Sequence, residues 1–293
     1  DEKDLIQAAS DQEKEFDRCW DQLIKITPYV PDLLTNCDDV DLFDYSKTTS
    51  RAEDNSKFKK GIPTWRTWAP PLPEGKKGRG FAHPECQRML CPISVNFADP
   101  NARDAFVLHK SPPATHHVWP RCTYAGYTGN IKNPGKGFLR SGLSKQGGLA
   151  IMHSPSEAEK LGESSGSDRG TRPGFADTHS ITQVTRPFLA YVATLLRYAL
   201  SDEEAFRVNG SFNYSHYYKD ILEYLEDPAF TEATDELVEW WNDQLFPDAQ
   251  HARRNPDLSG MSMIEHMRAQ VVAGDDGTSQ SDEQSEFREE PLQ

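Results

Sequence analysis

The stretch TRPFLAYVATLLRYAL, residues 185–200, decides the fold. Its apolar residues occupy most of the circumference of a helix, which is typical of a helix buried at the centre of a domain. Thr185 is a suitable N-cap, and Pro187 is tolerated in a first turn. Two further stretches follow with helical spacing of their apolar residues: NYSHYYKDILEYLED (213–227) and TEATDELVEWWNDQLFP (231–247). We therefore predict a mainly α-helical domain.

These three helices are expected to share one hydrophobic core. The connections between them are short, and helices joined by short connections usually pack against each other. Each helix places large apolar side chains on one face. The residues predicted to meet in the core are Tyr191, Leu195, Tyr217, Leu222 and Trp241.

Outward from this centre, the sequence predicts four regions. They are an N-terminal helical segment (1–43), a basic Pro/Gly-rich strap (44–80), the main helical domain (81–273) and a disordered acidic tail (274–293). Prolines and glycines argue against a long helix in the strap. Its Trp65 and Trp68 are expected to insert into the folded body, with a flexible linker as an equal alternative. Residues 81–150 are irregular and rich in Pro and Gly; short strands there would make the fold α+β instead.

The composition narrows the function classes. The chain has 293 residues and a net charge of −14, which argues against generic binding of nucleic acid or of an acidic membrane. It contains no apolar run of 18 residues, so no transmembrane helix is predicted. The five cysteines are odd in number and irregularly spaced, which favours a reducing compartment over a disulfide scaffold. We expect an intracellular protein, nuclear or cytoplasmic.

The strap is the one basic region of this acidic chain. Residues 47–80 hold nine Lys and Arg but three acidic residues. Such a segment can contact phosphates while its tryptophans stack on bases. We favour the alternative that it pairs with the protein's own acidic body. The candidate nucleic-acid-binding residues are Lys57, Lys59, Lys60, Trp65, Arg66, Trp68, Lys76, Lys77 and Arg79.

The candidate metal ligands are His83, Cys86, Cys91 and Cys122. Four thiolate and imidazole ligands can close a tetrahedral structural zinc site. The pattern lacks a tight C-x-x-C pair, however, and free cysteines are commonly buried. We therefore favour packed thiols and expect no cofactor. The neighbouring His116 and His117 are weak evidence for one metal site, because adjacent side chains project in different directions.

No catalytic motif is present in the sequence. The glycine-rich GNIKNPGKG (129–137) has the wrong spacing for a phosphate-binding loop. His83 and Glu85 spell H-x-E, but a facial iron triad needs strands that are not predicted here. No G-x-S-x-G nucleophile elbow occurs. The catalytic residues, if there are any, are unknown from sequence.

Several segments resemble a family of proteins of unknown function from mushroom-forming (basidiomycete) fungi. In order along residues 1–247 they are GRGFAHPECQRMLCP, PGKGFLRSGL, HSPSEA, VTRPFLAYVATLLRYALS, FNYSHYYKDILEYLED and ELVEWWNDQLFP. The resemblance implies an intracellular, multi-copy fungal protein with a link to mobile elements. It brings no catalytic residues with it.

Three function hypotheses follow. The first is a non-catalytic interaction protein that binds another protein through an aromatic groove, because the helical core is strong and every catalytic motif fails. The second is a nucleic-acid-associated factor that uses residues 47–80. The third is an enzyme whose site is assembled from loops, which a single sequence does not reveal.

Overall fold

The computed structural model consists of helices joined by irregular segments. It describes residues 37–254 except 74, 112, 161–172 and 205–211, with seven positions between 13 and 24 and residues 264, 267 and 268. Residues 1–245 form one compact unit and 246–293 a second. The described residues contain no strand, and their extended pairings are two isolated bridges, Pro92–Pro120 and Tyr124–Phe138. The prediction of a mainly α fold is confirmed, and the α+β alternative is wrong.

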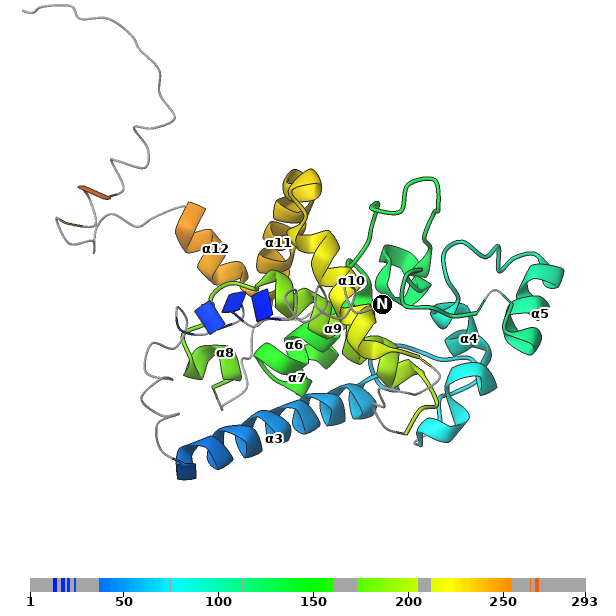
Figure 1. Cartoon of the computed structure of the whole chain (residues 1–293), viewed down its shortest axis with the longest axis horizontal. Coiled ribbons are helices and arrows are strands. Elements are labelled where there is room, and N and C mark those ends of the chain that lie inside the picture. Colours follow the sequence, from blue (N-terminus) through cyan, green and yellow to red (C-terminus); the bar gives the residue numbers. More distant parts are fainter. Residues whose placement is uncertain are drawn as a thin grey trace, which may run out of the picture. The chain divides into compact units, whose positions relative to one another are not determined.

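Helix α9 (Arg186–Leu200) is the centre of the first unit (Figure 1). Eleven of its fifteen residues are buried, as the apolar circumference predicts. The predicted N-cap is confirmed, because Thr185 Oγ1 accepts a hydrogen bond from the backbone N–H of Phe188 at 3.3 Å. Helices α3 (Cys37–Gly61), α6 (Gly142–Met152) and α10 (Tyr214–Glu226) all pack against α9.

The predicted core is confirmed at its centre and corrected at its edge. Helix α10 (Tyr214–Glu226) and helix α11 (Thr231–Leu245) supply Tyr217 and Trp241, both fully buried, which join Leu195. Tyr191 and Leu222 are only half-buried. Tyr191 lines an open pocket and its hydroxyl reaches Asp54 of α3, so its ring stays partly exposed.

Helix α6 (Gly142–Met152) is packed closely on two sides. A Cβ atom at Gly147 would lie 2.1 Å from Phe58 Cζ, and one at Gly148 would lie 2.7 Å from Trp241 Cζ3. The two glycines thus let α3 and α11 approach the α6 backbone on different faces. Ser141 caps the helix by accepting from the N–H of Ser144 at 3.1 Å.

Helix α3 (Cys37–Gly61) corrects the expectation that residues 44–80 hold no long helix. The prolines that argue against a helix begin only at Pro63, after α3 has ended. Near that end, the fully buried Arg79 donates to the carbonyl of Lys59 at 2.8 Å and to the carbonyl of Ala199, in α9, at 2.9 Å. One guanidinium therefore ties the C-terminal ends of α3 and α9, where helix dipoles favour a cation.

Short helices complete the first unit. They are α4 (Pro84–Leu90), α5 (Pro100–His109), α7 (Pro155–Lys160), α8 (Phe175–Thr178) and the 3-10 turns η1 (Lys76–Gly78), η2 (Gly80–Ala82), η3 (Arg121–Thr123), η4 (Ala125–Tyr127) and η5 (Pro228–Phe230). The second unit contains α12 (Pro247–Arg254). In the described part of the chain, no helix has both the length and the apolar character needed to cross a bilayer.

Two predicted regions fall largely outside the described residues. The seven described positions between 13 and 24 are helical, which agrees with the helical segment expected there. The acidic tail, 274–293, lies wholly outside the described residues, so its disorder stays a prediction.

Candidate functional site

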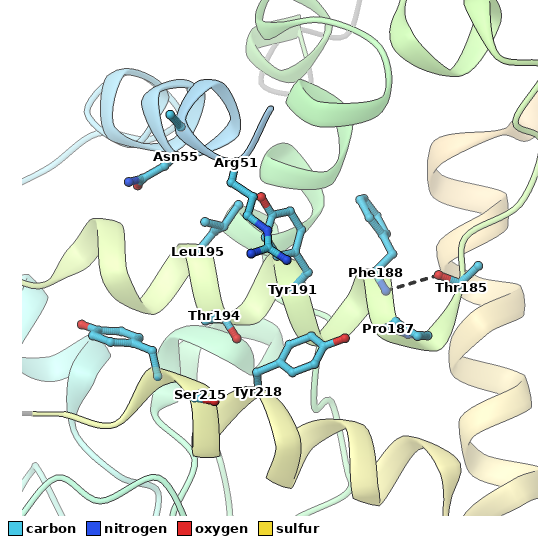
Figure 2. A pocket seen from close by; sticks show the side chains of 12 residues that line it. Arg51, Asn55, Thr185, Pro187, Phe188, Tyr191, Thr194, Leu195, Ser215 and Tyr218 are labelled. Atoms are coloured by element: carbon cyan, nitrogen blue, oxygen red, sulfur yellow. Dashed lines mark hydrogen bonds between the residues drawn. The ribbon is translucent and has the colours of Figure 1, made fainter. Parts of the chain in front are cut away.

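A groove of about 810 Å³ lies between α3, α9 and α10 (Figure 2). We call it the three-helix groove. Side chains from all three helices line it, and most of its surface is apolar. The lining residues are Arg51, Ala52, Asn55, Thr185, Pro187, Phe188, Tyr191, Thr194, Leu195, Tyr214, Ser215 and Tyr218. Its volume is within the range of about 300–1,000 Å³ that is usual for ligand pockets.

Several polar atoms of the groove already have partners within the chain. Tyr191 donates its hydroxyl to Asp54 Oδ2 at 3.3 Å, and the Tyr214 hydroxyl accepts from Arg197 Nη1 at 3.2 Å. Thr194 Oγ1 donates to the carbonyl one turn earlier at 2.8 Å. Burial raises the pKa of both tyrosines, so both stay neutral phenols at physiological pH. The rings and methyl groups, rather than the hydroxyls, are what these residues offer a ligand.

Arg51 is the formally charged side chain of the lining. It is exposed on α3 and forms no ion pair with the residues that the structure describes. The lining contains no carboxylate, histidine or cysteine. The groove therefore has the composition of a binding surface with one cationic contact.

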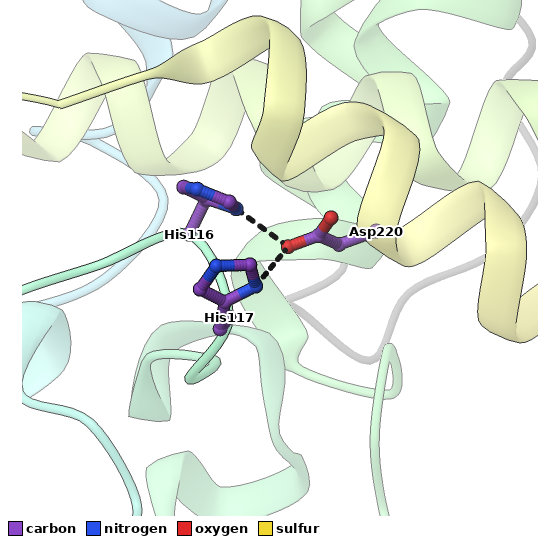
Figure 3. A group of neighbouring side chains, drawn as sticks. All are labelled: His116, His117 and Asp220. Atoms are coloured by element: carbon purple, nitrogen blue, oxygen red, sulfur yellow. Dashed lines mark hydrogen bonds and ion pairs between the residues drawn. The ribbon is translucent and has the colours of Figure 1, made fainter. Parts of the chain in front are cut away.

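A second candidate site joins His116 and His117 to Asp220 of α10, and we call it the histidine–aspartate cluster (Figure 3). Nδ1 of His116 lies 2.7 Å from Asp220 Oδ2, and Nδ1 of His117 lies 3.2 Å from the same oxygen. The two rings are 3.7 Å apart. The expectation that these neighbouring histidines diverge is wrong, because residues 116 and 117 occupy a turn that aims both rings at α10.

Aromatic packing holds this turn against α10. Trp119 stacks on Phe138 with ring centroids 3.9 Å apart and planes 9° from parallel. Trp119 also meets the edge of Tyr224, which is one turn beyond Asp220 on α10, at 5.3 Å. Trp119 follows His117 by two residues and packs on the helix that carries Asp220. It therefore holds both histidines next to that carboxylate.

The structure does not gather the residues predicted to bind zinc. Cys86, Cys91 and Cys122 are fully buried free thiols, and burial raises the pKa of Cys86 and Cys122 to about 12. The Nε2 atom of His83 lies 2.8 Å from the carbonyl of Pro70. At the histidine–aspartate cluster, three ligand atoms lie within 4.8 Å of one another. Among the described residues, the four predicted zinc ligands form no such group. Zinc at these four positions stays a prediction.

The predicted nucleic-acid residues are spread over separate elements. Trp65 and Trp68 are 7% and 5% exposed, which confirms that they insert into the folded body. Their faces are therefore not available to stack on bases. Lys57 pairs with Asp54 at 3.0 Å, and Lys60 is exposed in the last turn of α3.

The remaining basic residues of that set are mostly engaged within the chain. Arg66 pairs with Glu85 at 2.5 Å and covers the Trp68 ring. Lys76 Nζ lies 3.2 Å from the centre of the Tyr198 ring, and Lys59 approaches the same ring. Burial lowers the pKa of Lys76 to about 7, so part of its charge is lost at neutral pH. The Nζ atom of the exposed Lys77 lies 3.7 Å from a carboxylate oxygen of Glu204. Arg79 is fully buried and donates to the two helix carbonyls described above. Nucleic-acid binding by these residues stays a prediction, without support from their placement.

Sequence reasoning missed both sites in different ways. Tyr214 and Tyr218 are visible as a pair four residues apart, but the helices that complete the groove are distant in sequence. His216 and Asp220 show the same spacing on α10, and nothing in the sequence links them to His116.

Comparison with known proteins gives a family match. The model of a family of unknown function, DUF6698, matches residues 46–246. This range covers α3 from its middle and continues to the end of α11, so it includes the three-helix groove and the histidine–aspartate cluster. No curated protein and no solved structure matches the chain.

Proposed function

This chain belongs to the DUF6698 family, and we propose that it is a non-catalytic binding protein that holds a protein partner in the three-helix groove. The observation that carries the proposal is the groove itself, an aromatic hollow of about 810 Å³ between α3, α9 and α10. We further propose an intracellular location, nuclear or cytoplasmic, in a mushroom-forming fungus.

The chemistry of the lining favours binding over catalysis. Phe188, Tyr191 and Tyr218 present ring surface, which dominates the energetics of many interfaces. The hydroxyls of Tyr191 and Tyr214 are satisfied inside the chain. An apolar anchor could therefore enter without leaving these buried polar groups unpaired.

The proposed occupant is an amphipathic helix of the partner. A groove walled by helices accepts apolar anchors spaced at i, i+3 or i+4 on such a segment. The cationic Arg51 favours a carboxylate on the partner beside those anchors. A small apolar molecule is the alternative occupant and would not require that carboxylate.

A selection from a displayed library of helical peptides tests the proposal. The full chain is the bait, and the binding of enriched peptides is measured by fluorescence anisotropy. We expect enriched peptides to carry apolar residues at helical spacing and an acidic residue. Phe188→Ala and Tyr218→Ala should each weaken binding by about tenfold or more, which corresponds to about 1.4 kcal/mol.

The controls separate the groove from the rest of the surface. Phe175→Ala removes an aromatic ring that is 51% exposed and does not line the groove, so it should leave binding unchanged. Arg51→Glu should weaken an acidic peptide more than its Gln-substituted analogue. The proposal fails if no peptide is enriched, or if enriched peptides bind the Phe188→Ala and Tyr218→Ala proteins as they bind the wild type.

A further inference from the structure

We infer that the histidine–aspartate cluster is a site for a divalent transition-metal ion of the zinc type. The site is independent of the proposed function. His216 and Asp220 each lie two residues after a groove residue of α10, Tyr214 and Tyr218, and two residues along a helix turn its direction by roughly 200°. Groove and cluster therefore use separate faces of one helix.

The ligand set suits zinc. Two imidazoles and one carboxylate are the protein ligands of many zinc sites that keep a fourth position for water. Imidazole also disfavours magnesium and calcium, which prefer oxygen ligands. His116, His117 and Asp220 bring these groups together from two segments that are more than 100 residues apart.

The distances also suit a metal ion. Ligand atoms at about 2.0–2.1 Å from a tetrahedral ion are about 3.3 Å from one another. The separation from His117 Nδ1 to Asp220 Oδ2 is 3.2 Å, and that from His116 Nδ1 is 2.7 Å. A small rotation of the His116 ring would open the shorter contact enough for an ion to replace the hydrogen bond.

The surroundings allow an ion to enter and hold its ligands in place. His117 is 70% exposed, whereas the side chains of His116 and Asp220 are 20% and 25% exposed. Trp119 fixes the turn from behind through its stacking on Phe138. The exposed ring of His216 lies 5.0 Å from that of His116 and adds a further imidazole next to the site.

Titration of the full chain with zinc sulfate tests the inference. Protein stripped with a chelator is titrated by calorimetry, and its melting temperature is measured with and without zinc. We expect one high-affinity ion per chain and a higher melting temperature with zinc, since an ion that binds the folded state stabilises it. Asp220→Asn and His117→Ala should each weaken zinc binding by at least about tenfold.

A matched control and a spectroscopic probe identify the ligands. His179→Ala removes an exposed histidine outside the cluster and should leave the affinity unchanged. Cobalt(II) bound at the cluster should give visible d–d bands without the charge-transfer band of thiolate ligands. Absence of stoichiometric binding overturns the inference. So does zinc binding that persists unchanged in the folded Asp220→Asn and His117→Ala proteins, or a cobalt complex with thiolate bands, since each places the ion at the cysteines or elsewhere.

Discussion

Buried side-chain donors hold the irregular part of the chain together, residue by residue. Trp68 donates to the carbonyl of Ile62 at 2.9 Å, and Gln146 donates to that of Trp65 at 2.9 Å. Trp241 donates to the carbonyl of Leu139 at 3.0 Å. These carbonyls belong to segments without a helix or strand partner, and a buried unpaired carbonyl is costly. In this region, side-chain donors thus supply the hydrogen bonds to backbone carbonyls that neighbouring strands supply in a β-sheet.

Trp241 should be among the most stabilising residues of the molecule. It is fully buried, and it both fills the core beside Gly148 and pairs the Leu139 carbonyl. We expect Trp241→Ala to lower the free energy of unfolding by about 3–5 kcal/mol, as for other buried large aromatics. Chemical denaturation measures the change. The neighbouring Trp240 is half-buried, so Trp240→Ala should cost clearly less; equal losses would show that the core is not centred on Trp241.

At the level of elements, helices with a wide apolar stripe were predictable, and helix α3 was not. Helices α9, α10 and α11 can be recognised in the sequence, because burial of one face requires apolar residues at helical spacing. The described part of helix α3 contacts the body through polar groups as well as through Phe58: Asp54 accepts from Tyr191, and the carbonyl of Lys59 accepts from Arg79. Among the described side chains of α3, the fully buried apolar one is Phe58. Such a helix has little periodicity to find.

The close packing of α3 on α6 gives a prediction for Gly147. Alanine usually stabilises a helix relative to glycine by about 1 kcal/mol. At this position the added methyl would lie 2.1 Å from Phe58 Cζ, so we expect Gly147→Ala to destabilise the protein by about 1–3 kcal/mol through overpacking. Thermal unfolding followed by circular dichroism gives the sign.

Two further variants test this explanation. Gly142 begins the same helix, and its added methyl would lie 3.3 Å from the Tyr127 hydroxyl, so Gly142→Ala should be nearly neutral. Phe58→Leu combined with Gly147→Ala should recover part of the loss, because the shorter side chain makes room. A stabilising Gly147→Ala would mean that α3 is free to move away from α6.

For the molecule as a whole, neither candidate site could be predicted from the sequence. The groove needs three helices that the chain brings together over more than 160 residues, from Arg51 to Tyr218. The histidine–aspartate cluster needs a turn at His116 and a face of α10 that is 104 residues away. Burial of apolar stripes leaves a local pattern in a sequence, but the meeting of polar side chains from distant elements does not.

The buried thiols give a measure of the stability of the whole first unit. Cys86, Cys91 and Cys122 are fully buried, and burial disfavours the reactive thiolate. In a protein with Cys19→Ser and Cys37→Ser, we expect no rapid reaction with a thiol reagent in native buffer. All three thiols should react in denaturant. Rapid labelling of the native protein would show that the unit around α4 opens independently.

The hydrogen bonds of Arg79 affect how selective the three-helix groove can be. Its guanidinium joins the ends of α3 and α9, which supply two walls of that groove, yet Arg79 itself does not line it. Walls fixed from outside discriminate between ligands by size, because a well-packed wall accommodates an extra methylene poorly. Under the proposed function, closely related partners would then be sorted by the volume of a single anchoring side chain, and Arg79 would set that limit without lining the groove.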